Sequence, residues 1–105
     1  MVSFFSRLFG DSSQEDGSAK RSDPVPYGNF LICAAPQRKG DSWHLSGVII
    51  KPGEDGAEDL EREYIRADTF TSHDEAVSFS QRKGEQIIDE QGDRLFADGE
   101  KTGRA

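Results

Sequence analysis

Three runs of apolar and β-branched residues follow one another along the chain, separated by polar, turn-forming stretches. Residues 30–35 form a continuous apolar run that Pro36 ends. Residues 43–51 are rich in β-branched side chains after Gly47, a residue that marks a bulge or a close backbone approach. Residues 61–67 form the third run. Because the loops between the runs are short, we predict an antiparallel meander of three strands.

A helix follows the third strand, and its start is the best-defined local event in the sequence. Ser72 precedes Glu75 by three residues, which is the spacing of a capping box. Apolar residues then recur on one broad helical face, and Gly92 is a natural C-terminal stop. We expect Leu95 and Phe96 to fold back as a short hydrophobic clasp.

The predicted fold class is therefore α+β: a three-stranded antiparallel β-meander followed by one packed α-helix (βββα), with a flexible N-terminal arm. The single domain spans residues 25–96. Residues 1–10 form a short amphipathic segment, and residues 11–24 form a flexible linker rich in serine, glycine and charge. Residues 97–105 are expected to be disordered.

The N-terminal segment has two interpretations. Nine residues are marginal as an isolated helix in water, which favours a frayed or weakly packed helix. The alternative is a helix that docks on a partner or a membrane surface, although its single Arg7 offers little attraction to anionic lipid. Its apolar residues are Val2, Phe4, Phe5, Leu8 and Phe9.

Small residues occupy the centre of the apolar helix face. Ala76, Ser80 and Gly84 are spaced four apart and would form a shallow groove. Since glycine costs about 1 kcal/mol relative to alanine inside a helix, a packing reason is expected for Gly84. The groove would receive the sheet or a large side chain such as Trp43 or Tyr64, or else it is an interface between two copies of the chain.

The third strand carries the candidate binding residues. If Ile65 faces the helix, strand alternation places Arg62, Tyr64 and Arg66 on the open side of the sheet. An aromatic residue between two arginines there would suit single-stranded nucleic acid or a phosphorylated ligand. The alternative is a solvated strand face whose arginines pair with carboxylates on neighbouring strands.

Charge and composition narrow the functional class. The 105 residues carry a net charge of −7, which weighs against unaided nucleic-acid binding because phosphate contacts need clustered lysine and arginine. The sequence shows neither a signal peptide nor a long apolar run, so we expect a cytoplasmic protein. Cys33 is the only cysteine and is expected to be a buried hydrophobe. No histidine and cysteine have zinc-ligand spacing, so no metal site is predicted.

The sequence gives no support for an enzyme. Ser72, His73 and Asp74 include the residue types of a catalytic triad, but consecutive residues at a helix start cannot converge on one another. No phosphate-binding loop is recognisable, and no cofactor is predicted.

Four blocks of the sequence, in order, carry a family resemblance. They are Ala34-Ala35-Pro36-Gln37, Trp43-His44-Leu45-Ser46-Gly47, Tyr64-Ile65-Arg66-Ala67-Asp68-Thr69-Phe70, and Gln86-Ile87-Ile88-Asp89-Glu90-Gln91-Gly92-Asp93-Arg94-Leu95-Phe96. With them, the chain resembles the small HlyU family of bacterial proteins, and its first ten residues look like the start of that family. The resemblance implies a role in transcription, because the family is named for activators of haemolysin expression.

A helix and an incompletely covered sheet favour an interaction module, because exposed apolar surface often marks a partner or dimer interface. We therefore expect a regulatory or adaptor protein, linked to transcription, that works by protein contact or self-association. The alternative is a nucleic-acid-binding regulator that uses the open sheet face.

Overall fold

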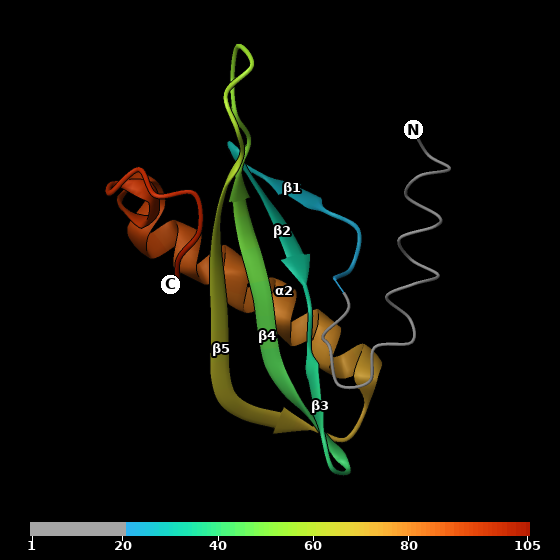
Figure 1. Ribbon diagram of the computed structural model, residues 1–105. Coiled ribbons are helices and arrows are strands. Elements are labelled where there is room, and N and C mark those ends of the chain that lie inside the picture. Colours follow the sequence, from blue (N-terminus) through green and yellow to red (C-terminus); the bar gives the residue numbers. More distant parts are fainter. Residues whose placement is uncertain (1–20) are drawn as a thin grey trace.

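One antiparallel sheet backed by one long helix makes up residues 21–105, the part of the chain that the computed structural model describes (Figure 1). The fold class is α+β, as predicted, but the sheet has five strands instead of three. The elements are β1 (Val25–Tyr27), β2 (Phe30–Ala34), β3 (Gln37–Lys39), β4 (Ser42–Lys51), β5 (Leu60–Phe70), α2 (His73–Gln91) and the 3-10 helix η1 (Gly92–Phe96).

Strand β4 is the centre of the sheet. It pairs with β5 on one side, and on the other side with β2 and then β3, all antiparallel. The three predicted strands correspond to β2, β4 and β5. The two additional strands are short pieces that turns fold back onto their neighbours, at Gly28 and Gly40, whose φ angles are 63° and 62°. Residues 37–39 are polar, which is why the sequence pattern indicated only a turn there.

Helix α2 crosses one face of the sheet, behind the strands in the view of Figure 1. Its start is confirmed by Ser72, whose Oγ accepts a hydrogen bond from the Glu75 backbone N–H at 3.2 Å. Its end is confirmed at Gly92, which has a φ of 50° and donates its N–H to the Ile88 carbonyl. The clasp is also confirmed, because Leu95 and Phe96 are buried in η1.

The main core lies between the sheet and the helix. It is built from strand residues that share one face and from the C-terminal half of α2 and η1. Phe96 stacks on Phe30 with 5.8 Å between ring centroids, so the clasp closes one end of this core. The buried members are Phe30, Ile32, Leu45, Ile49, Tyr64, Ile87, Ile88, Leu95 and Phe96.

The C-terminal tail, residues 97–105, differs from what the sequence predicted. Residues 97–105 were expected to be disordered, yet they lie along the outer edge of β5. Glu61 N–H donates to the Lys101 carbonyl and Glu63 N–H donates to the Gly103 carbonyl, both at 2.8 Å. Ala105 N–H donates to the Glu63 carbonyl at 2.7 Å. The tail is ordered because it satisfies backbone groups that an edge strand would otherwise leave unpaired within the protein.

At the other end, the predicted amphipathic segment and the predicted linker up to residue 20 lie outside the described residues. The last part of that linker is tied to the sheet. Ser22 N–H donates to the Ala34 carbonyl at 2.7 Å, and Arg21 reaches Glu61.

Candidate protein-contact surfaces

The predicted binding residues on β5 do not stand together on the open sheet face. Arg62 and Tyr64 are 2% and 1% exposed and lie beneath α2 and η1, whereas Ile65 is 42% exposed on the opposite face. The condition on which this platform depended, that Ile65 faces the helix, does not hold, and the alternation is inverted. Arg66 is half-buried, and its guanidinium donates to the carbonyl of its own neighbour Ile65 at 2.9 Å.

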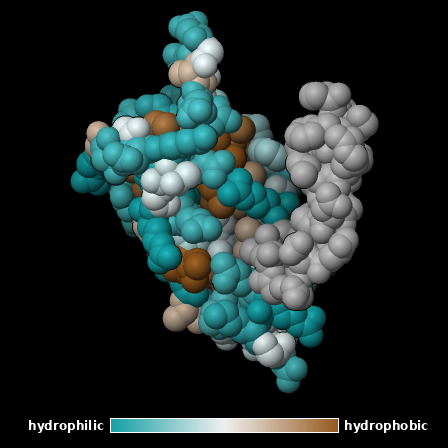
Figure 2. All heavy atoms as spheres, viewed as in Figure 1, coloured by the Kyte–Doolittle hydropathy of each residue, from teal (hydrophilic) through white to brown (hydrophobic). Residues whose placement is uncertain are grey.

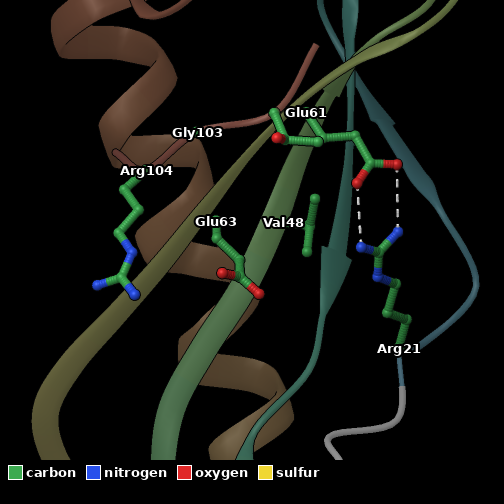
Figure 3. A pocket seen from close by; sticks show the side chains of 7 residues that line it. Arg21, Val48, Glu61, Glu63, Gly103 and Arg104 are labelled. Atoms are coloured by element: carbon green, nitrogen blue, oxygen red, sulfur yellow. Dashed lines mark hydrogen bonds and ion pairs between the residues drawn. The ribbon is translucent and has the colours of Figure 1, made fainter. Parts of the chain in front are cut away.

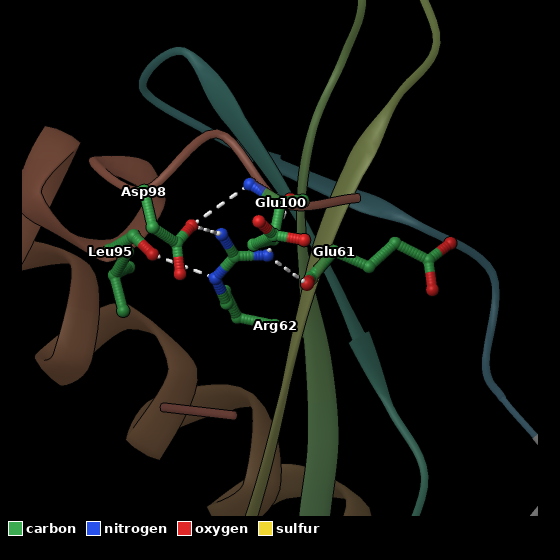
Figure 4. A network of polar contacts seen from close by, with 5 residues as sticks. All are labelled: Glu61, Arg62, Leu95, Asp98 and Glu100. Carbon is green, nitrogen blue, oxygen red and sulfur yellow. Dashed lines mark hydrogen bonds and ion pairs between the residues drawn. The ribbon is translucent and has the colours of Figure 1, made fainter. Parts of the chain in front are cut away.

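Arg62 has a structural role instead of a binding one (Figure 4). Its guanidinium donates to the carbonyl oxygens of Leu95, Glu61 and Glu100 at 2.8, 2.6 and 3.1 Å. It also forms a 2.6 Å ion pair with Asp98, whose side chain is 63% exposed. A buried guanidinium requires such a set of acceptors, and the turn between η1 and the tail supplies them.

Tyr64 fills the groove of small residues on α2. Its hydroxyl donates to the Ser80 carbonyl at 2.7 Å, and a Cβ placed on Gly84 would lie 2.8 Å from that hydroxyl oxygen. The intradomain packing predicted for Ala76, Ser80 and Gly84 is thus what the structure shows. The alternative, an interface between copies along this groove, was wrong because Ala76 and Ser80 are fully buried within one chain.

Gly47 provides the close approach expected from the sequence. It lies directly across from Tyr64 in the β4–β5 register. A Cβ on Gly47 would overlap the Tyr64 hydroxyl group and lie 2.9 Å from the Cys33 carbonyl oxygen. Only glycine leaves room for the tyrosine ring to cross β4 at this point.

In the part of the chain described here, α2 lies on one face of the sheet and no helix lies on the opposite face (Figure 1). Three apolar residues there, Cys33, Val48 and Ile50, are nonetheless buried. The expected exposed apolar surface on this face is therefore reduced to Ile65 and the partly buried Leu31. Figure 2 shows this face as a largely hydrophilic surface with small hydrophobic patches.

Charged residues frame a shallow pocket of about 340 Å³ on the same face (Figure 3). Arg21 holds Glu61 through two hydrogen bonds of 3.0 and 3.3 Å, which raise the pKa of the arginine. Val48 lies between this pair and Glu63, and Arg104 of the tail lines the far side. The pocket therefore combines two carboxylates with two guanidinium groups, so it offers partners to both cationic and anionic groups of a protein.

A second surface lies where β3, β4 and β5 meet the start of α2. Trp43 packs edge-on to His73, with 4.6 Å between ring centroids. Phe70, the cross-strand neighbour of Trp43, stacks on Phe79 of α2 at 5.0 Å. Phe79 remains 39% exposed, which is unusual for a phenylalanine in a chain with so thin a core.

Two arginines complete this second surface, which we call the aromatic–arginine end. The Arg38 Cζ atom lies 5.5 Å from the centre of the Trp43 ring, and the Arg82 Cζ atom lies 5.3 Å from that of Phe79. The sequence pattern did not indicate this surface, because its members come from β3, β4, β5 and α2, which only the fold brings together. The signal that could have found it is the run of aromatic residues at the ends of neighbouring elements.

Other chemistry has little basis in the described residues. Cys33 is buried, and burial raises the pKa of its thiol, so it is a poor nucleophile. Within residues 21–105, no group of three or more histidine, cysteine or acidic side chains is placed to hold a metal ion. No helix in the described part of the chain is long and apolar enough to cross a membrane.

Comparison with known families decides the relationship that the sequence blocks suggested. The model of the family described as transcriptional activator HlyU matches residues 3–96, which is most of the chain. The chain belongs to the HlyU family. The family is one of transcriptional regulators and not of enzymes, which assigns this member a role in regulating transcription. No curated protein and no solved structure matches the chain.

Proposed function

We propose that this HlyU family member regulates transcription from the cytoplasm as an adaptor that contacts another protein, without reading DNA and without catalysing a reaction. The contact surface is the sheet face opposite α2. There, exposed Ile65 lies on the same face of β5 as the carboxylates of Glu61 and Glu63.

The observation that carries the proposal is the inverted alternation of β5. It places Ile65 outside, where a contiguous partner surface can cover it, in a shallow hollow that it shares with Glu63 and Arg104. An exposed apolar residue next to charged groups is typical of a protein interface, whose core is apolar and whose rim is polar.

The same observation weakens the nucleic-acid alternative. Its platform was Arg62, Tyr64 and Arg66, and the first two are buried and occupied by Leu95, Asp98 and Ser80. On the face that remains exposed, the two arginines of the pocket are matched by Glu61 and Glu63, so the pocket has no excess of positive charge for a phosphate backbone.

Two measurements test the proposal. The purified protein is titrated with double-stranded DNA at low and at moderate salt, and a photo-crosslinking amino acid is placed at position 65 in native cells. We expect no DNA binding at low salt and a specific protein crosslink from position 65. The control crosslinker replaces Gln86, which is exposed on α2.

Either of two results would contradict the proposal. One is DNA affinity that falls steeply as salt is raised, the signature of phosphate contacts. The other is an identical set of crosslinked proteins from positions 65 and 86, which would mean that the sheet face has no preferred partner.

A further inference from the structure

We propose that the aromatic–arginine end binds an acidic segment of a partner protein that also carries apolar side chains. This inference rests on the proposed function, because it names the chemical class of partner for a protein that works by contact. The end comprises Arg38, Trp43, Phe70, His73, Phe79 and Arg82.

Five of the side chains form one row across four elements, and the sixth, His73, packs against Trp43. Arg38 and Trp43 are cross-strand partners in β3 and β4, and Trp43 and Phe70 are cross-strand partners in β4 and β5. Phe70 stacks on Phe79, with an angle of 11° between the two rings, and Arg82 lies over Phe79. The row therefore begins and ends with a guanidinium, and aromatic rings lie between.

Arg38 and Arg82 differ from Arg21 and Arg62, which form ion pairs with carboxylates. Arg21 and Arg62 are neutralised by Glu61 and Asp98, respectively. Within the described residues, no carboxylate forms an ion pair with Arg38 or Arg82. Arg38 makes one side-chain hydrogen bond, to the Gly40 carbonyl at 3.2 Å. Each guanidinium lies over an aromatic ring, with 5.5 Å from Arg38 Cζ to the Trp43 centroid and 5.3 Å from Arg82 Cζ to the Phe79 centroid, and this contact leaves N–H groups for a carboxylate.

Charge complementarity selects an acidic partner. The chain carries −7 overall, so an acidic segment would be repelled by most of the surface and attracted at these two unpaired arginines. The exposed ring of Phe79 between them supplies the apolar contact. Burial of such a ring gains free energy at about 25 cal/mol per Å² of apolar area.

Nucleic acid fits this surface less well. Base stacking needs an aromatic ring with a free face, as in single-strand-binding proteins. Here Trp43 is already contacted by His73 and Arg38, and Phe79 by Phe70 and Arg82.

Trp43 makes the site directly observable, because it is the only tryptophan of the chain. The full-length protein is titrated with a synthetic peptide of alternating glutamate and leucine, and Trp43 fluorescence is recorded. Reference ligands are the same peptide with lysine in place of glutamate, and a single-stranded DNA oligonucleotide. We expect saturable binding of the acidic peptide, weaker at high salt.

The variant Arg38→Gln/Arg82→Gln should weaken that binding by roughly tenfold, since each exposed ion pair contributes a few tenths to about 1 kcal/mol. The matched control, Lys51→Gln/Arg94→Gln, removes two exposed positive charges and changes the net charge equally, and Lys51 lies at the opposite end of β4 from Trp43. It should leave the affinity within about twofold. If Arg82→Gln perturbs the fold, Arg38→Gln alone in the exposed hairpin decides the question.

Three outcomes would overturn the inference. They are equal weakening by both double variants, equal affinity for the lysine peptide, and tighter binding of the DNA oligonucleotide. If any of these occurs while the crosslinker at position 65 still captures one protein, the adaptor function stands and only this site falls. If the acidic peptide fails these tests and the crosslinker at position 65 also captures no specific protein, the adaptor proposal is wrong as well.

Discussion

Tyr64 contacts β4 at one position and α2 at two. Its ring crosses β4 at Gly47, its hydroxyl reaches the Ser80 carbonyl, and its tip occupies the space that Gly84 leaves open. A large side chain with one polar atom suits this position, because the ring fills the groove and the hydroxyl finds an acceptor. The sheet-to-helix contact is thus set by one tyrosine and two glycines.

Gly47→Ala should therefore destabilise the protein by about 1–3 kcal/mol through overpacking. The added Cβ overlaps a hydroxyl group that Ser80 holds in place, so the tyrosine cannot move away cheaply. Urea unfolding measures the loss. In a Tyr64→Phe background the same substitution should cost less, because one of the two overlapping atoms is gone and Ser80 no longer holds the ring in place. Equal costs in the two backgrounds would show that the Tyr64 hydroxyl does not set the packing at Gly47.

Burial of Tyr64 also predicts a loss of stability in alkali. Desolvation raises the pKa of its hydroxyl above the ordinary value of 10.0. Because the unfolded chain releases this proton first, the contribution is fully present below pH 10.0 and is lost as the pH rises toward the folded pKa.

Urea unfolding between about pH 8 and about pH 11 measures this loss, which approaches about 1.4 kcal/mol per pH unit above the unfolded pKa. The comparison uses Cys33→Ala with and without Tyr64→Phe, since burial also raises the pKa of the Cys33 thiol. The variant that keeps Tyr64 should lose more stability in alkali. Parallel curves for the two variants would contradict the assignment.

At the scale of elements, β5 connects the sheet with the helices and with the tail. It pairs with β4 on one side and with the tail on the other, and its even-numbered residues, including Arg62 and Tyr64, face α2 and η1. Arg62 joins this strand to η1 through the Leu95 carbonyl, and to the tail through the Glu100 carbonyl and the Asp98 carboxylate. The order of the tail therefore depends on one buried guanidinium.

Arg62→Lys should cost about 2 kcal/mol, because an ammonium group keeps the charge but cannot reach all of the acceptors, which leaves some unpaired. Hydrogen exchange should show faster exchange at the amides of Glu61, Glu63 and Ala105, which pair β5 with the tail. Arg66→Lys is the matched control, since Arg66 bonds only to the adjacent Ile65 carbonyl. Protected tail amides in Arg62→Lys would contradict this role.

At the scale of the whole molecule, segments on both sides of the predicted domain, residues 25–96, contact the sheet. Arg21 and Ser22, predicted to belong to the linker, contact Glu61 and Ala34. The tail beyond Phe96 provides acceptors for Arg62 and backbone partners for β5. Residues 21–105, instead of residues 25–96, contain the complete sheet, both apolar clusters and the Arg62 network.

A chain of residues 21–105 should therefore unfold cooperatively with nearly the stability of the full chain. A chain that ends at Phe96 should lose about 2–4 kcal/mol, because three backbone hydrogen bonds disappear and Arg62 loses buried partners. Thermal and urea unfolding compare the two truncations. Equal stability of the full chain and the chain ending at Phe96 would restore the original boundary.

The sequence alone determined the local events of this protein. The capping box at Ser72, the stop at Gly92, the three principal strands and the need for a large side chain over Gly84 all follow from rules that act within a few residues. The family could also be recognised from the sequence, because its blocks lie in order along the chain, and the family model matches residues 3–96.

Tertiary structure alone decided which face of β5 is buried. Alternation separates Tyr64 from Ile65 but does not say which of the two faces the helix. Two of our predictions conflicted here, since Tyr64 cannot both fill the helix groove and stand on the open face. The groove prevailed because a ring with a satisfied hydroxyl fills it better than isoleucine. Ile65 therefore lies outside and Arg62 beneath the clasp, where carbonyls contributed by the distant η1 and tail segments pair with its charge.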